Sequence, residues 1–114
     1  MAKYLFRANY VGKGVEGLLK EGGTSRRDTV AKAISAAGGK LESFYYAFGD
    51  TDLYIIGDFP DHATVAAVIL TVTATGTVTC KTTVLLTPEE LDKAAKKTPT
   101  YSPPGQLGGV DFKL

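Results

Sequence analysis

The chain has few of the residue types on which most chemical sites depend. Among 114 residues it contains one cysteine, one histidine and no tryptophan. A lone Cys80 excludes an internal disulfide and a multi-cysteine metal site. His62 has no second histidine or cysteine close to it in the sequence to complete a zinc site. We therefore expect no metal and no cofactor, and we expect Cys80 to be a buried, unreactive thiol.

An excess of charge of one sign and long apolar runs are also missing. The formal net charge is +1, so the chain lacks the basic surface that binds nucleic acid or anionic membranes. No apolar run approaches the length of a membrane span, and the N-terminal residues do not form a secretion signal. The composition, 44% hydrophobic and 22% charged, is ordinary for a globular domain. These features predict a cytoplasmic protein with no nucleic-acid and no membrane partner.

The first half of the chain predicts three strands and two helices. The apolar alternation around Phe6 is typical of a strand, Ser25 with Asp28 resembles a helix-capping box, and the segment 49–52 has the composition of a hairpin turn. The predicted elements are a strand over 3–10, a short helix over 15–20, a helix from Ser25 to Gly38-Gly39, and strands over 40–48 and 53–59.

The second half of the chain contains one segment with two competing patterns. Residues 62–74 carry an apolar helical stripe that Asp61 can cap, yet their β-branched residues also suit a strand that turns at Gly76. The helix is favoured because the order of the chain is then strand-helix-strand-strand-helix-strand, in which every strand and helix has a partner. A strand over 77–86 follows. Thr87-Pro88-Glu89-Glu90 then predicts a capped helix that reaches about Lys97.

This order is the ferredoxin-like βαββαβ arrangement of an α+β domain, with an extra short helix after the first strand and a C-terminal helix. We assign the domain to residues 1–97 and an extended C-terminal arm to residues 98–114. The second strand is apolar on both faces, with Phe44 and Tyr46 opposite Leu41 and Tyr45, and a bare face of that kind is uncommon in monomers.

A homo-oligomer of the dimeric α+β barrel type would cover that face. The arm can pack on its own subunit or on a neighbouring one, and the second arrangement fits an oligomer. The arm residues expected to make this contact are Tyr101, Leu107, Val110 and Phe112.

A glycine motif near the N-terminus is the first candidate for chemistry. The segment 12–17 matches G-x-G-x-x-G after a strand. The helix that follows stops at Gly22-Gly23, and the next strand begins too late to supply the acid that binds a ribose. We interpret the motif as a flexible loop.

Four residues are candidates for ligand binding. Arg26 and Arg27 lie in the first turn of a predicted helix, where a cation opposes the dipole and can serve an anion. Tyr10 and Tyr46 supply phenols that can orient a small ligand. Solvated surface, for the arginines, and core or interface packing, for the tyrosines, are the competing interpretations.

Three further residues are candidates for catalysis. His62 lies at a helix N-terminus, where the dipole favours the neutral imidazole that acts as a base. Tyr45 and Asp52 are its candidate partners. A lone surface histidine is the commoner interpretation of His62, and a hairpin former is the favoured interpretation of Asp52.

Short segments along most of the chain together resemble the GYD domain family. They are Asn9-Tyr10, the segment 17–23, Arg26-Arg27, the segment 38–45, Gly49 with Asp52, Pro60-Asp61, the segment 87–90 and the segment 101–105. One position departs, because Thr51 stands where the family pattern has tyrosine. The resemblance implies a ferredoxin-like fold and oligomers, and it implies no established reaction, so no catalytic residue is carried over.

The leading interpretation is an oligomeric module that binds a small molecule or serves in assembly. One alternative is a cofactor-free oxygenase or isomerase of the dimeric α+β barrel kind that uses Tyr45, His62 and Asp52. Another is a structural component of a larger homo-oligomer.

Overall fold

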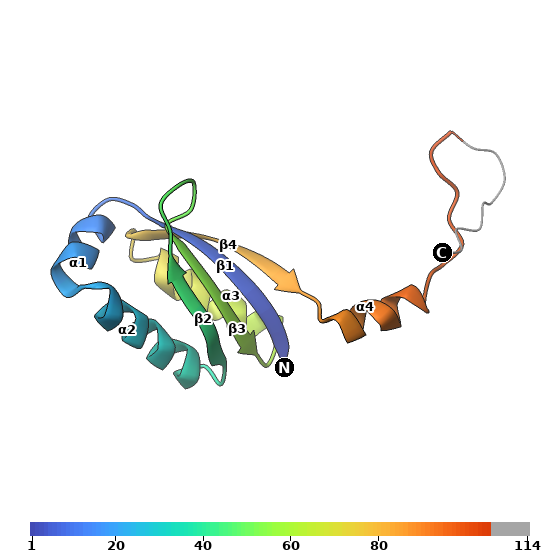
Figure 1. Cartoon of the computed structure of the whole chain (residues 1–114), viewed down its shortest axis with the longest axis horizontal. Coiled ribbons are helices and arrows are strands. Elements are labelled where there is room, and N and C mark those ends of the chain that lie inside the picture. Colours follow the sequence, from blue (N-terminus) through green and yellow to red (C-terminus); the bar gives the residue numbers. More distant parts are fainter. Residues whose placement is uncertain (106–114) are drawn as a thin grey trace.

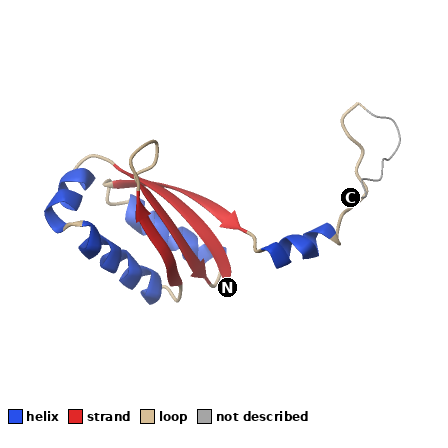
Figure 2. Ribbon diagram, in the orientation of Figure 1, coloured by secondary structure: helices blue, strands red, loops and turns tan. Residues whose placement is uncertain are grey.

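A computed structural model describes residues 1–105 of the chain. Its elements in chain order are β1 (Ala2–Tyr10), α1 (Gly14–Glu21), α2 (Gly23–Ala36), β2 (Lys40–Tyr46), β3 (Leu53–Phe59), α3 (His62–Thr73), β4 (Val78–Leu85) and α4 (Pro88–Ala95). The predicted order of strands and helices is confirmed, and the domain is of the α+β class (Figure 2). The segment after Asp61, where helix and strand patterns compete, is a helix.

The strands form one four-stranded antiparallel sheet in the order β2-β3-β1-β4. Because β1 and β2 both run antiparallel to β3, their C-terminal ends lie at the same end of the sheet. Residues of α2 and α3 pack against the core on one face, and the opposite face is open (Figure 1). The turn between α1 and α2 therefore lies near the end of the sheet where β1 and β2 finish.

The core lies between this sheet and the two helices. It contains Tyr4, Phe6, Ala8, Ile34, Leu53, Ile55, Phe59 and Val65. The alternation in β1 and β3 directs the strand residues of this set to the helix-covered face, as the sequence predicts. Phe59 is fully buried and its ring meets that of Tyr4 edge-on at 5.9 Å. A buried aromatic of this size stabilises the fold by roughly 1.5–3 kcal/mol through transfer from water.

The second strand differs from its predicted pattern. Simple alternation places Leu41 opposite Phe44, but the register shifts between Leu41 and Ser43. The extra residue of this irregularity returns Leu41 to the face of Phe44, and both pack against the core. The strand also ends at Tyr46 rather than at Phe48, whose side chain is fully exposed.

The start of α2 also differs from the prediction. Gly22 precedes the helix with a φ of 86°, which glycine adopts without the steric cost of a side chain, and α2 begins at Gly23. Ser25 consequently lies within the first turn and does not cap it. Asp28 pairs with the adjacent Arg27 at 3.2 Å instead of closing a capping box.

The segment from Pro88 onward leaves the body of the domain. Thr87 and Glu90 form the predicted capping box at the start of α4, and residues 88–102 are all exposed (Figure 1). The radius of gyration is 18.7 Å, whereas about 13 Å is typical of a compact domain of this length. The expected contacts of Leu107, Val110 and Phe112 lie outside the described residues.

Candidate ligand-binding site

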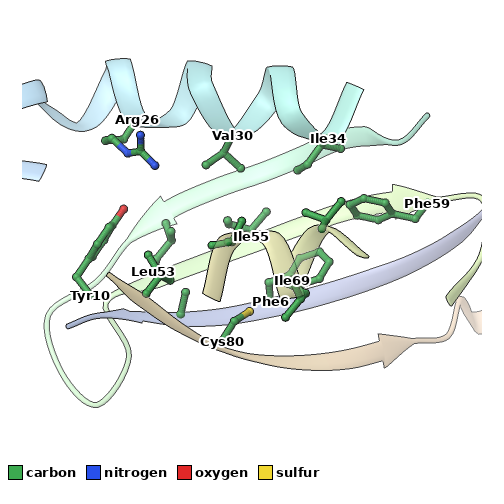
Figure 3. A pocket seen from close by; sticks show the side chains of 14 residues that line it. Phe6, Tyr10, Arg26, Val30, Ile34, Leu53, Ile55, Phe59, Ile69 and Cys80 are labelled. Carbon is green, nitrogen blue, oxygen red and sulfur yellow. The ribbon is translucent and has the colours of Figure 1, made fainter. Parts of the chain in front are cut away.

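Tyr10, Arg26 and Tyr46 lie close together at one end of the sheet. Tyr10 ends β1 and Tyr46 ends β2, and the parallel course of these two strands brings their ends together. Arg26 lies in the first turn of α2, directly after the α1–α2 turn. Figure 3 shows the side chains of Arg26 and Tyr10 pointing toward one another across the space between helix and sheet.

An apolar cavity of about 90 Å³ extends from this pair between the sheet and the helices α2 and α3 (Figure 3). Its wall is formed mainly by aliphatic and aromatic side chains, among them Phe6, Val30, Ile55, Val72 and Cys80. Arg26 supplies the charged group of the lining. The arrangement is an apolar pocket with a guanidinium and a phenol at one end.

Two wider clefts border Tyr10. One, of about 300 Å³, lies between α1 and the start of β4 and shares Arg26 and Tyr10 with the cavity. The other, of about 550 Å³, lies between α1 and the β2–β3 hairpin and includes Tyr46 and Asp52. Tyr10 thus borders all three hollows, and a molecule larger than the cavity has room beside it.

The polar side chains at this end have partners within the protein. Arg26 Nη1 lies 3.3 Å from Glu21 Oε2, an exposed pair of the kind that contributes little to stability. The Tyr46 hydroxyl donates to the carbonyl oxygen of Gly23 at 3.0 Å. Partial burial, together with the neighbouring Tyr10 phenol, raises the pKa of Tyr46 to about 12. Tyr46 is therefore a neutral hydrogen-bond donor at neutral pH.

Asp52 supports this end of the sheet through the backbone. Its Oδ2 accepts a hydrogen bond from the Tyr10 amide at 3.0 Å, and its own amide donates to Asn9 Oδ1 at 2.9 Å. These bonds tie the base of the β2–β3 hairpin to the end of β1. Asp52 thus positions Tyr10, a role that the sequence analysis did not assign to it.

His62 lies at the opposite end of β1. Its Nδ1 is 2.6 Å from the Tyr4 hydroxyl, and the two rings meet edge-on. At ~3.3 Å per strand residue, Tyr4 and Tyr10 are about 20 Å apart along β1. His62 is therefore remote from Asp52.

Tyr45 lies on the open face of the sheet. It is opposite Tyr54 in the register and its side chain is 70% exposed. Tyr45, His62 and Asp52, the candidate catalytic residues, thus occupy three separate places and do not form one cluster. Of the four candidate ligand-binding residues, Tyr10, Arg26 and Tyr46 come together, whereas Arg27 is exposed and pairs with Asp28.

Cys80 and the glycine motif have structural settings. Cys80 lines the cavity, and burial raises the pKa of its thiol, which keeps it protonated. Gly14 begins α1 against the backbone of Thr77, where any side chain would clash with the Thr77 carbonyl oxygen. Gly12 has a φ of 54°. Packing and turn geometry therefore account for Gly12 and Gly14.

Two features are absent from residues 1–105. This part of the chain has no group of three or more His, Cys, Asp and Glu side chains placed to hold a metal ion. Nor does it include a helix with the length and apolar character needed to cross a membrane.

Comparison with known proteins identifies the family of the chain. No curated protein and no solved structure matches it. The family model of the GYD domain matches residues 4–95, which include every helix, α4 among them, every strand except the first two residues of β1, and the site formed by Tyr10, Arg26 and Tyr46. The chain therefore belongs to the GYD domain family.

Proposed function

We propose that this GYD domain binds a small carboxylic acid with a short apolar portion. The observation that carries the proposal is the half-buried guanidinium of Arg26 at the end of an otherwise apolar cavity. A cation in the first turn of a helix opposes the dipole, and the exposed Glu21 offsets this only weakly. A carboxylate received by Arg26 in a bidentate geometry would compensate the charge at this position.

The size of the cavity limits the apolar portion. An engineered protein cavity of about 150 Å³ accepts benzene, and the cavity here is about 90 Å³. A short aliphatic chain fits this volume better than an aromatic ring. The Tyr10 phenol can donate a second hydrogen bond to the carboxylate, and any further part of the ligand has room in the adjoining clefts.

The proposed module is a homo-oligomer of ferredoxin-like subunits. The chain order of strands and helices, with β1 at the centre of the sheet, supports this topology. The open face supports self-association, because Leu5, Tyr45, Tyr54 and Ile56 form an apolar area on it. Two such faces packed together would give the dimeric α+β barrel.

A comparison of acids with their amides tests the ligand proposal. We expect short carboxylic acids to raise the melting temperature, while the corresponding amides, of almost the same shape but uncharged, do not. A ligand at a hundred times its dissociation constant adds about 2.7 kcal/mol to stability. Arg26→Met should abolish the shift, and Arg27→Met, the matched control at the adjacent exposed arginine, should retain it. Equal shifts with amides, or a shift that survives in Arg26→Met, would contradict the proposal.

Cys80 provides an independent measurement of occupancy. Because its thiol lines the cavity, a bound acid should slow its alkylation, and the amide should not. An alkylation rate that is the same with and without a stabilising acid would mean that the acid binds elsewhere.

The open-face interface has its own test. Tyr45→Lys places a charge in the apolar part of the face and should reduce the mass measured by sedimentation to that of a monomer. Thr79→Lys, on the polar side of the same face at β4, where Thr79 is opposite Asn9, should not. A wild-type protein that is monomeric would contradict this arrangement and leave the ligand proposal intact.

A further inference from the structure

We propose that α4 of one copy of this chain docks into the groove between α3 and β4 of a second copy. Each surface is apolar, and neither is covered within the part of the chain that the structure describes. The groove shares Ile69 with the apolar cavity, but the polar end of the ligand site, at Arg26 and Tyr10, lies at the other end of the sheet.

The first surface is the apolar side of α4. Leu91, Ala94 and Ala95 follow the i, i+3, i+4 spacing of one helix face, and Leu86 lies two residues before the helix. Leu86 and Leu91 are each 60% exposed. Lys93 lies on the opposite side of the helix, so α4 is amphipathic although it projects from the body.

The second surface is a groove of about 400 Å³ along α3. Its lining is mainly apolar and comprises Tyr4, His62, Val65, Ala66, Ile69, Leu70, Thr82 and Val84. Leu70 is 69% exposed and Val84 is 52% exposed. Over its 12 residues α3 contains no Asp, Glu, Lys or Arg, although its outer side faces away from the sheet. A helix without a charged face is typical of an element covered by another surface.

The two surfaces match in length. The groove follows α3 from His62 to Leu70, and α4 has 8 residues. At ~1.5 Å per residue, both lengths are about 12 Å. Leu91 of α4 can therefore reach the exposed Leu70 while the following alanines lie along the groove.

The junction before α4 disfavours docking within one chain. Only Leu86 and Thr87 separate β4 from α4. Thr87 has an extended backbone. Its side-chain hydroxyl oxygen accepts from the Glu90 amide at 3.1 Å, and its own amide donates to Glu90 Oε1 at 3.1 Å, which completes the capping box. Pro88 at the start of the helix fixes its own φ and restricts the backbone of Thr87 further. With this junction, α4 continues away from the sheet and from α3, as Figure 1 shows.

A second copy of the chain supplies a groove that α4 can fill. Each copy carries both the helix and the groove, so a two-fold arrangement lets α4 of each copy fill the partner's groove in the same way. The start of α4 is close to the groove in sequence, because Val84 lines the groove and α4 begins at Pro88. The two α4 helices can therefore be exchanged between adjacent subunits.

Mixing two single-cysteine variants of the full chain tests the exchange. Both start from Cys80→Ser; one carries Leu91→Cys and the other Leu70→Cys, at positions exposed enough for the fold to tolerate them. A short bis-maleimide should give a cross-linked dimer in the mixture at several times the yield of either variant alone. Lys93→Cys mixed with Leu70→Cys is the matched control and should give only the background yield.

Two outcomes would overturn the proposal. The first is a mixture with no more cross-linked dimer than the Lys93→Cys control. The second is a doubly substituted chain, carrying Leu91→Cys and Leu70→Cys together, that cross-links only within itself. That result would place α4 in the groove of its own chain.

Discussion

Two tyrosines of β1 face the same side of the sheet but have different surroundings. Tyr4 is 1% exposed, its hydroxyl is 2.6 Å from His62 Nδ1, and its ring packs against Phe59. Tyr10 is only partly buried, borders three hollows and faces a guanidinium. The same residue type on the same strand thus completes the core at one end and leaves the other end open.

The difference arises from what covers each end. At the Tyr4 end, α3 begins directly over the strand, with Asp61 capping the helix through the Thr64 amide at 2.7 Å. At the Tyr10 end, two short turns join β1 to α1 and α1 to α2, and neither fills the space above the sheet. Room for a small ligand between the sheet and its helices therefore opens toward the second end.

Removal of the Phe59 side chain should show the largest effect. Phe59→Ala is expected to lower the free energy of unfolding by about 3–5 kcal/mol, since it leaves a cavity beneath Tyr4. Phe48→Ala, at an exposed phenylalanine beside the open end, should change it by less than about 0.5 kcal/mol. Urea unfolding monitored by circular dichroism measures both. Equal losses would mean that the two ends are equally packed.

Removal of the Tyr4 hydroxyl should have an intermediate effect. Tyr4→Phe keeps the ring but removes the bond to His62, and about 1 kcal/mol of stability should be lost. Tyr45→Phe, at a solvent-exposed hydroxyl on the open face, is the matched control and should be close to neutral. A Tyr4→Phe variant as stable as the wild type would show that the bond to His62 does not secure this end.

Much of the fold follows from local signals in the sequence. The bounds of β3 match the predicted 53–59, because Asp52 and Pro60 flank a clear alternation. The capping box at Thr87 is equally local. The irregularity in β2 has no such signal, since no glycine marks the extra residue between Leu41 and Ser43. The early start of α2 was missed because it depends on the positive φ of Gly22, which a capping pattern at Ser25 conceals.

The site was only partly predictable for a different reason. Arg26 is conspicuous in the sequence because its charge opposes a helix dipole. Tyr10 and Tyr46 lie beside Arg26 because β1 and β2 share the partner strand β3 and therefore run parallel to each other. The same topology separates His62 from Asp52. Residue types indicate the available chemistry, and the strand order decides which residues meet.

The pH dependence of Tyr46 gives the smallest expected effect and tests the open end most directly. The pKa of Tyr46 is raised from 10.0 to about 12, so the folded state favours the neutral phenol. Its stabilising contribution is fully present below about pH 10 and is lost as the pH rises through about 12.

The variant Tyr46→Phe tests this dependence. It also lacks the bond to the Gly23 carbonyl oxygen, so the wild type should be the more stable protein at neutral pH. Because the phenyl ring of this variant cannot ionise, the difference in unfolding free energy between the two proteins should shrink between about pH 10 and about pH 12. Groups that do not interact with Tyr46 contribute equally to both proteins and cancel in this difference. A difference that stays constant over this range would mean that the phenol is as well solvated as in the unfolded chain, and that the open end is wetter than its partly buried Tyr46 indicates.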